Sequence, residues 1–204
     1  MPASPSTLDI QALSDDVRQT LLRLARQAIA SHWQPQLQAQ LDALVHDIPG
    51  GEQPLACFVT LHLHGELRGC IGCLEPTGPL ASSLIRYARA AAFEDPRFPP
   101  LRPSELPQCT LSLSLLGPLA PLPAGSRQEL TAALTPGVDG LWLISPGHKA
   151  TFLPAVWHEL PGRPEFINQL LRKGGWPAGT WPEKLQAWRY SATEVSEQPS
   201  RLQP

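Results

Sequence analysis

The sequence reads LACFVTLHLHGELRGCIG over residues 55–72, and this stretch predicts the β-hairpin on which the fold is built. Apolar residues occupy every second position from Leu55 to Leu63, which is typical of a strand with one buried face. His64-Gly65-Glu66 interrupts this pattern, and a three-residue loop with Gly65 in a left-handed conformation would return the chain into residues 67–72. We therefore expect two antiparallel strands.

The register of this hairpin follows from polarity, because a shift by one residue would exchange the two faces of a strand. In the register that keeps apolar residues opposite apolar ones, the pairs on the apolar face are Leu63–Leu67, Leu61–Gly69, Val59–Ile71 and Cys57–Cys73. The pairs on the other face are His62–Arg68, Thr60–Cys70 and Phe58–Gly72. Cys70 is thus expected beside Thr60 and Arg68, with His62 diagonal to it.

The remaining elements follow from helical and strand periodicity. Ser14 is the expected N-cap of the first helix and Thr77 that of the third, while Ser126 and Glu129 form a capping box. The expected helices are residues 14–33, 37–45, 79–93, 126–134 and 164–173, and the further strands are residues 109–115, 140–145, 148–153 and 186–195. Hairpins that alternate with helices predict an α+β fold, with a mostly antiparallel β-sheet flanked by helices and a smaller satellite lobe.

Length, composition and charge narrow the class of protein. The 204 residues fit one domain over residues 14–197, either alone or with a small lobe, between disordered termini at residues 1–13 and 198–204. The formal net charge of −2 and the lack of a basic stripe argue against nucleic-acid binding. Residues 1–10 lack the pattern of a signal peptide, and no apolar run is long enough to cross a bilayer. We therefore expect a soluble cytoplasmic protein whose four cysteines are thiols.

Cys70 and Arg68 are the candidate catalytic residues. Side chains two apart on a strand project from the same face, and a fixed positive charge favours the thiolate, which is the reactive form of cysteine. Cys70 would then be a nucleophile or a ligand contact that Arg68 activates. The alternative is that Cys70 is a small buried thiol in a tight hairpin, since free cysteine is among the most buried residue types, and that Arg68 is ion-paired or at the surface.

Six further residues are candidates for binding: Thr60, His62, Gly69, Gly72, Asp95 and Arg97. The two glycines leave room for a ligand to approach the backbone closely. Asp95 and Arg97 lie in a rigid, proline-rich loop, where the acid could orient an arginine or transfer a proton. A shared site predicts that Arg68, Cys70, Asp95 and Arg97 line one concavity. The alternative is a clasp between Asp95 and Arg97 within the loop.

Cys70 and Cys73 have the C-x-x-C spacing of metal and redox sites. No second pair accompanies them, and two thiols three apart on a strand face opposite sides, so we predict no metal site and no cofactor. Cys57 lies opposite Cys73 in the expected hairpin, but a reducing compartment disfavours a disulfide. The tryptophans toward the C-terminus are Trp176, Trp181 and Trp188. Their irregular spacing favours packing in the small lobe over a surface for stacking bases.

Several of these segments together resemble the AMMECR domain family, the proteins similar to AmmeMemoRadiSam system protein A. The resemblance rests on FVTL at residues 58–61, LRGCIG at 67–72 and AAFEDPRFPP at 91–100, with shorter matches at 139–141, 152–154, 165–166 and 173–176. It covers residues 15–197 and implies an α+β fold with a main antiparallel sheet and a smaller lobe. It also implies association with a Memo-like protein and a radical-SAM protein, and it supplies no reaction. His62 and Cys73 lie outside the motif.

Two classes of function follow from these residues. In the first, the hairpin at Leu67–Gly72 binds or transforms an anionic or carbonyl-bearing small molecule, as an enzyme with cysteine chemistry at Cys70 or as an enzyme subunit in a radical-SAM system. In the second, the protein is a non-enzymatic adaptor that presents the same groove to a partner protein. The reactivity of the Cys70 thiol separates the two.

Overall fold

In the computed structural model, residues 8–197 are described and the chain divides into two compact units. Unit 1 comprises the chain up to Leu116 together with the segment from Thr193, and unit 2 comprises Gly117–Ala192. The disorder expected for residues 1–7 and 198–204 lies outside the described residues. Residues 8–13 were expected to belong to the same N-terminal tail, but they form a turn that packs Leu13 against the core of unit 1.

Unit 1 contains a four-stranded sheet and three helices. The strands are β1 (Cys57–Leu63), β2 (Glu66–Gly72), β3 (Cys109–Leu116) and β8 (Ala192–Ser196), in the order β2-β1-β3-β8. The helices are α1 (Asp15–Ala30), α2 (Gln38–His46) and α3 (Leu80–Phe93), with 3₁₀ turns at Pro35–Leu37 and Leu106–Gln108. β1 pairs antiparallel with both β2 and β3, so β2 is an edge strand.

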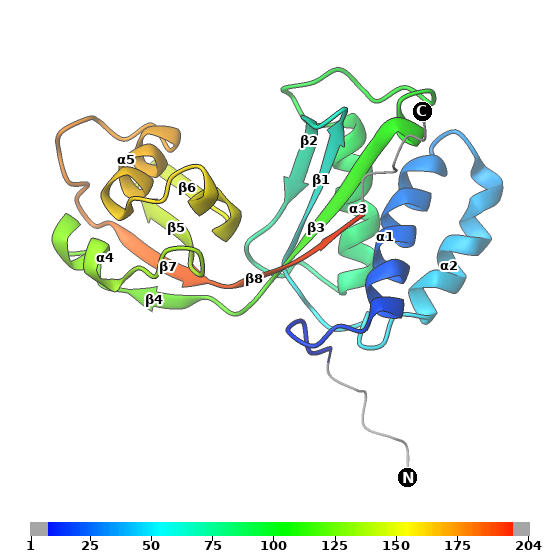
Figure 1. The fold of residues 1–204 in the computed structure, drawn as a ribbon, viewed down its shortest axis with the longest axis horizontal. Helices are drawn as coiled ribbons and strands as arrows, with labels where there is room; N and C mark the ends of the chain where they lie inside the picture. The colour runs from blue at the N-terminus through cyan, green and yellow to red at the C-terminus, as the bar shows by residue number, and fades with distance from the viewer. Residues whose placement is uncertain (1–7, 198–204) are drawn as a thin grey trace, which may run out of the picture. The chain divides into compact units, whose positions relative to one another are not determined.

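The helices of unit 1 pack on one face of its sheet, as Figure 1 shows for α1 and α3. Val59 and Leu61 of β1 and Leu111 and Leu113 of β3 point into this core and are fully buried. The alternate residues of these strands, such as Thr60, point to the other face and are half-buried. The predicted sorting by polarity is therefore confirmed for β1. On β2 it fails next to the turn, where Leu67 is 39% exposed and Arg68 is buried.

Of the two N-caps expected in unit 1, that of α1 is found and that of α3 is not. Ser14 caps α1, because its side chain accepts a hydrogen bond from Val17 N at 3.4 Å. The prediction that Thr77 caps α3 is wrong, because the N-cap is Pro79 and no side chain caps that end. The Thr77 hydroxyl instead lies 3.2 Å from the Tyr87 hydroxyl, where it ties the loop to the side of α3.

The hairpin turn differs from the expected three-residue loop. The turn has two residues, His64 (φ 54°) and Gly65 (φ 86°), and it pairs Leu63 with Glu66. Both central residues have the positive φ that a two-residue type I′ turn requires. The expected pairs His62–Arg68 and Leu63–Leu67 are wrong, because the register shifts at a bulge next to Leu61 and pairs His62 with Leu67 and Leu63 with Glu66.

Unit 2 contains the second four-stranded sheet, so the expectation of one main sheet is incomplete. Its strands are β4 (Ala120–Leu122), β5 (Gly140–Ser145), β6 (His148–Phe152) and β7 (Gln186–Tyr190), in the order β4-β7-β5-β6. Its helices are α4 (Arg127–Ala133) and α5 (Arg163–Lys173), with a 3₁₀ turn at Pro154–His158. The single strand expected over residues 186–195 is two strands, because the chain leaves one sheet after Tyr190 and enters the other at Ala192.

The core of unit 2 forms between α5 and the sheet. Phe166 and Leu170 of α5 are fully buried, and the Phe166 ring stacks on Trp157 with the ring centroids 3.7 Å apart. The predicted capping box at α4 is confirmed in part, since the Ser126 hydroxyl accepts from Glu129 N at 3.2 Å. Over residues 8–197, no helix is both long enough and apolar enough to cross a membrane.

Candidate functional site

Cys70 lies on the half-buried face of the unit 1 sheet, opposite Thr60 of β1 as the sequence predicted. The Thr60 hydroxyl donates a hydrogen bond to Cys70 Sγ at 3.3 Å. Thr60 is in turn opposite Ser112 of β3, and Ser114 lies two residues along that strand. The thiol on β2 and these hydroxyl groups on β1 and β3 therefore form a row across three strands, with the thiol at one end.

The backbone of Cys70 is held from outside the sheet by the Asp95–Arg97 loop. Cys70 N donates to Asp95 Oδ2 at 2.9 Å, and Arg97 Nη2 donates to Cys70 O at 3.3 Å. Arg97 also donates to Asp95 through Nε at 2.9 Å and Nη2 at 2.6 Å. This ion pair occupies the N–H and C=O that an edge strand would otherwise leave open, so it closes β2 where another strand would pair.

The two members of this pair are in different environments. The Asp95 side chain is 2% exposed, whereas that of Arg97 is 53% exposed. Hydrogen bonds from Arg97, and then from Cys70 N, hold the pKa of the Asp95 carboxyl well below its usual range in spite of burial. The clasp between Asp95 and Arg97 that the sequence left as an alternative is thus formed, and it also contacts Cys70.

Arg68 forms its ion pair with Glu105 and not with Asp95, the acid that contacts Cys70. Its side chain is 10% exposed, and Nε and Nη2 donate to Glu105 Oε1 and Oε2 at 3.2 and 3.3 Å. Arg102 N also donates to Glu105 Oε2, at 2.8 Å, and the pKa of the Glu105 carboxyl is lowered chiefly by Arg68. The positive charge of Arg68 is thus balanced by a carboxylate that the sequence reasoning missed. Glu105 lies in a loop far along the chain, where residue spacing gives no indication of it.

Gly69 and Gly72 are needed by the protein's own packing. A Cβ on Gly69 would overlap Ala91 O and lie 3.0 Å from the Ala91 carbonyl carbon, so α3 crosses β2 against this glycine. A Cβ on Gly72 would lie 2.5 Å from the Cα of Phe58 on the neighbouring strand. The sequence analysis expected a ligand to approach the backbone at these glycines. In the structure, α3 approaches Gly69 and β1 approaches Gly72.

The other cysteines differ from Cys70 in their surroundings. All four are free thiols; Cys57 and Cys109 are buried, and Cys73 is half-buried like Cys70. Burial, and then the neighbouring Cys73, raises the pKa of the Cys57 thiol to about 12. Within residues 8–197, no three His, Cys, Asp or Glu side chains are grouped as ligands for a metal ion. His62 shares the face of Thr60 and lies opposite Thr110 of β3.

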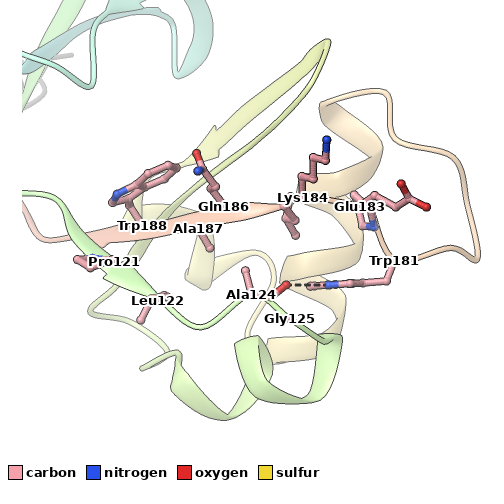
Figure 2. A pocket seen from close by; sticks show the side chains of 12 residues that line it. Pro121, Leu122, Ala124, Gly125, Trp181, Glu183, Lys184, Gln186, Ala187 and Trp188 are labelled. Atoms are coloured by element: carbon pink, nitrogen blue, oxygen red, sulfur yellow. Dashed lines mark hydrogen bonds between the residues drawn. The ribbon is translucent and has the colours of Figure 1, made fainter.

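The tryptophans of unit 2 divide between the core and a groove. Trp176 is buried, as predicted for core packing. Figure 2 shows Trp181 and Trp188 at the two ends of a groove of about 570 Å³ along β7. Trp181 Nε1 donates a hydrogen bond to Ala124 O at 2.9 Å. The ring centroids of Trp188 and Trp142 are 5.2 Å apart. These two rings are therefore half-buried walls of a groove in addition to packing residues.

Comparison with known proteins places most of the chain in one family. The sequence pattern of the AMMECR1 family matches residues 22–195. A protein of Methanothermobacter thermautotrophicus is 37% identical over 182 residues, 88% of this chain and 94% of that protein. A protein of Thermococcus kodakarensis is 31% identical over 198 residues, 91% and 93% of the two chains. An uncharacterised protein of Pyrococcus horikoshii, known from its crystal structure, has a TM-score of 0.81 at 28% identity over 93% of this chain and 95% of its own. This chain therefore belongs to the AMMECR1 family.

Proposed function

We propose that this protein binds a carbonyl-bearing small molecule at the Cys70 thiol, on the hydroxyl-lined face of the unit 1 sheet. The observation that carries the proposal is the fixation of Cys70. Its backbone N–H and C=O are both held by the Asp95–Arg97 pair, and its Sγ accepts a hydrogen bond from the Thr60 hydroxyl. A reactive group held in one position on a rigid strand is what a binding or catalytic site needs.

A carbonyl group suits this face better than an anion does. Arg68 and Arg97 are each already paired with a carboxylate, Glu105 and Asp95, so a ligand anion would have to compete with a partner in place. Hydroxyl groups, such as those of Thr60 and Ser112, can donate a hydrogen bond to a carbonyl oxygen. The Cys70 thiol can add to the carbonyl carbon: the Sγ–C bond forms, the π pair moves to oxygen, and that oxygen takes up the proton that the thiol loses.

The partners proposed for this site are a Memo-like protein and a radical-SAM protein. Support for them comes from the family resemblance, in which such proteins accompany the domain. In that arrangement the Cys70 site would receive or deliver a small molecule within a multi-protein system, and a cytoplasmic location would follow.

A non-enzymatic adaptor is the second candidate function, and a different observation favours it. Gly69, Gly72 and Asp95 all have contacts within unit 1 that explain them as architecture. Leu67, next to the hairpin turn, is 39% exposed, which is unusual for a large apolar side chain in this protein. A hairpin stiffened by the motif could present Leu67 to a partner protein.

The first expected result concerns the rate of alkylation by iodoacetamide at pH 7. If Cys70 is a site residue, it should react about tenfold faster than Cys73 or more, because a fixed and accessible thiol on a polar face is easier to attack. Cys57 should stay unmodified, because its raised pKa of about 12 keeps it protonated. Peptide mapping by mass spectrometry gives the four rates separately.

Cys73 is the matched control, since it is half-buried on the same hairpin and has the same chemistry. The Cys70→Ser variant should remove the fast phase and leave the other three rates unchanged. Equal rates for Cys70 and Cys73 would contradict the proposed thiol site and leave the adaptor as the better account.

The adaptor function has its own test, co-purification of the protein with the Memo-like and radical-SAM proteins of the same genome. Leu67→Ser should reduce the recovered partner several-fold if the hairpin is the docking surface, because an exposed leucine contributes its burial energy to the interface. Val138→Ser is the matched control, since Val138 is also an exposed apolar residue and lies in unit 2. Equal recovery with both variants would exclude the hairpin as the contact.

A further inference from the structure

Unit 2 contains a second concave region, which we call the α5 cavity. It has a volume of about 620 Å³ and lies between α5 and the loop that follows that helix. One wall comes from Asn168, Leu171 and Arg172 of α5, another from residues 176–180, and Arg127 at the start of α4 completes it. All of these residues belong to unit 2 and are separate from the Cys70 site of unit 1.

Arg127 is held in place by neutral groups. Its Nη1 donates a hydrogen bond to Asn168 Oδ1, and its guanidinium carbon lies 5.4 Å from the centre of the Trp181 ring. An amide oxygen and an aromatic face orient a guanidinium without neutralising its charge. The side chain is thus half-buried, positioned and still positive.

The helix that Arg127 begins does not stabilise the positive charge of this residue. Arg127 is the first residue of α4, and the N-terminus of a helix favours negative charge, so a cation is disfavoured there. Arg172 is different, because it lies in the last turn of α5, where the helix end favours a cation. The helix ends therefore account for the position of Arg172 but not for that of Arg127.

The α5 cavity has an excess of positive charge. No aspartate or glutamate lines it, while both arginines do. The ion pairs found within residues 8–197 involve neither Arg127 nor Arg172. The groove in Figure 2 lacks this excess, since Glu183 and Lys184 both line it.

The rest of the wall is apolar or uncharged. Trp176 and Leu171 are largely buried and present apolar surface to the cavity, and the Trp176 ring is fixed by a hydrogen bond from Nε1 to Ser145 Oγ at 2.7 Å. Thr180 adds a hydroxyl at the rim. A few placed polar groups around an apolar wall are typical of small-molecule sites.

We infer that the α5 cavity binds a small molecule with an oxyanion, a carboxylate or phosphate, held by Arg127 and Arg172, and with an apolar ring or chain against Trp176. Guanidinium groups form paired, charge-assisted hydrogen bonds with such oxyanions, which are stronger than neutral ones. This site is additional to the one proposed at Cys70 and does not depend on it.

The test is calorimetric titration of the full chain at low salt with phenyl phosphate, with benzoate, and with benzyl alcohol as the uncharged counterpart. We expect one saturable site for phenyl phosphate, for benzoate, or for both, and none for benzyl alcohol; which anion binds more tightly identifies the oxyanion. Arg127→Gln should lower the affinity about tenfold or more, as loss of a charge-assisted contact does. Arg127→Lys keeps the positive charge but loses the planar guanidinium that can donate two parallel hydrogen bonds. Its affinity should therefore lie between those of the unmodified protein and Arg127→Gln.

Arg163→Gln is the matched control, because Arg163 is on the same helix about 13 Å from Arg172 along its axis and does not line the cavity. It should bind like the unmodified protein, as should Cys70→Ser. Arg172→Gln protects the test against misfolding, since this side chain is exposed and the ion pairs found within residues 8–197 do not involve it, and it should lower the affinity several-fold. Absence of saturation by either anion at about 10 mM would overturn the inference, since a Kd of about 1 mM would be nearly saturated there. An equal loss in Arg163→Gln and Arg127→Gln would also overturn it.

Discussion

Replacing Gly69 by alanine is expected to destabilise the protein by about 3 kcal/mol or more, the size of effect that severe overpacking produces. The added Cβ would overlap Ala91 O and approach the Ala91 carbonyl carbon to 3.0 Å. Both are backbone atoms of α3, so no side-chain rotation relieves the contact, and either the helix or the edge strand must move. The measurement is the midpoint of urea unfolding followed by circular dichroism.

Two other glycines serve as controls for this prediction. Gly78→Ala should change the free energy of unfolding by less than about 0.5 kcal/mol, because a Cβ there meets no atom within 4 Å. Gly65→Ala should cost about 1 kcal/mol, because its φ of 86° is unfavourable for alanine although the space is open. If Gly69→Ala were no worse than Gly65→Ala, the close packing of α3 on β2 would be refuted.

The hairpin shows which part of a fold residue patterns can predict. Thr60 opposite Cys70 and Leu61 opposite Gly69 followed from polarity alone, because side chains alternate strictly along a strand. The turn did not follow. A three-residue loop and a two-residue turn followed by a one-residue bulge use the same number of residues. They therefore give the same pairing from Leu61 onward, and they differ only in whether the third unpaired residue lies in the loop or in the strand. Polarity cannot distinguish them.

The two sheets were not predictable for a related reason. Residues 186–195 carry one continuous strand pattern, and the chain changes sheets at Ser191. Both sheets demand the same period of two, so nothing in the local pattern marks the exchange. It depends on which strands the segment meets, which is a tertiary property.

The candidate site was predictable where its members are close in sequence. Asp95 and Arg97 are two residues apart in a loop, so a clasp between them was one of two alternatives. Asp95 and Cys70 are twenty-five positions apart, and the family resemblance supported only the expectation that they share a concavity; the hydrogen bond from Cys70 N to Asp95 was not predicted. The partner of Arg68 lies thirty-seven positions away and had no such support, which is why an ion-paired Arg68 was expected only as an alternative with no partner named.

Replacing Asp95 by asparagine is the second large expected effect, a loss of about 2 kcal/mol at pH 7, since hydrogen bonds to charged groups contribute about 1.5–3 kcal/mol. Asparagine has the same shape but no charge, so the contacts to Cys70 N and to the Arg97 guanidinium weaken together. The hydrogen exchange of the Cys70 amide should also become faster, because this edge-strand group loses its acceptor. Asp47→Asn, at an exposed helix end, should change stability by less than about 0.5 kcal/mol.

The pH dependence identifies the charge of Asp95 as the cause. Its pKa in the folded protein is lowered below the value of about 3.9 that an aspartate has in an unfolded chain. A lowered pKa means that the carboxylate stabilises the fold above about pH 4, and that this contribution is lost as the pH falls from there toward the folded-state pKa. The difference in unfolding free energy between the unmodified protein and Asp95→Asn should therefore be constant from about pH 5 to 7 and shrink steadily below about pH 4. A difference that stays constant as the pH is lowered toward 2 would mean that Asp95 acts through its shape and its neutral hydrogen bonds, and the ion pair with Arg97 would then contribute nothing to closing the edge of β2.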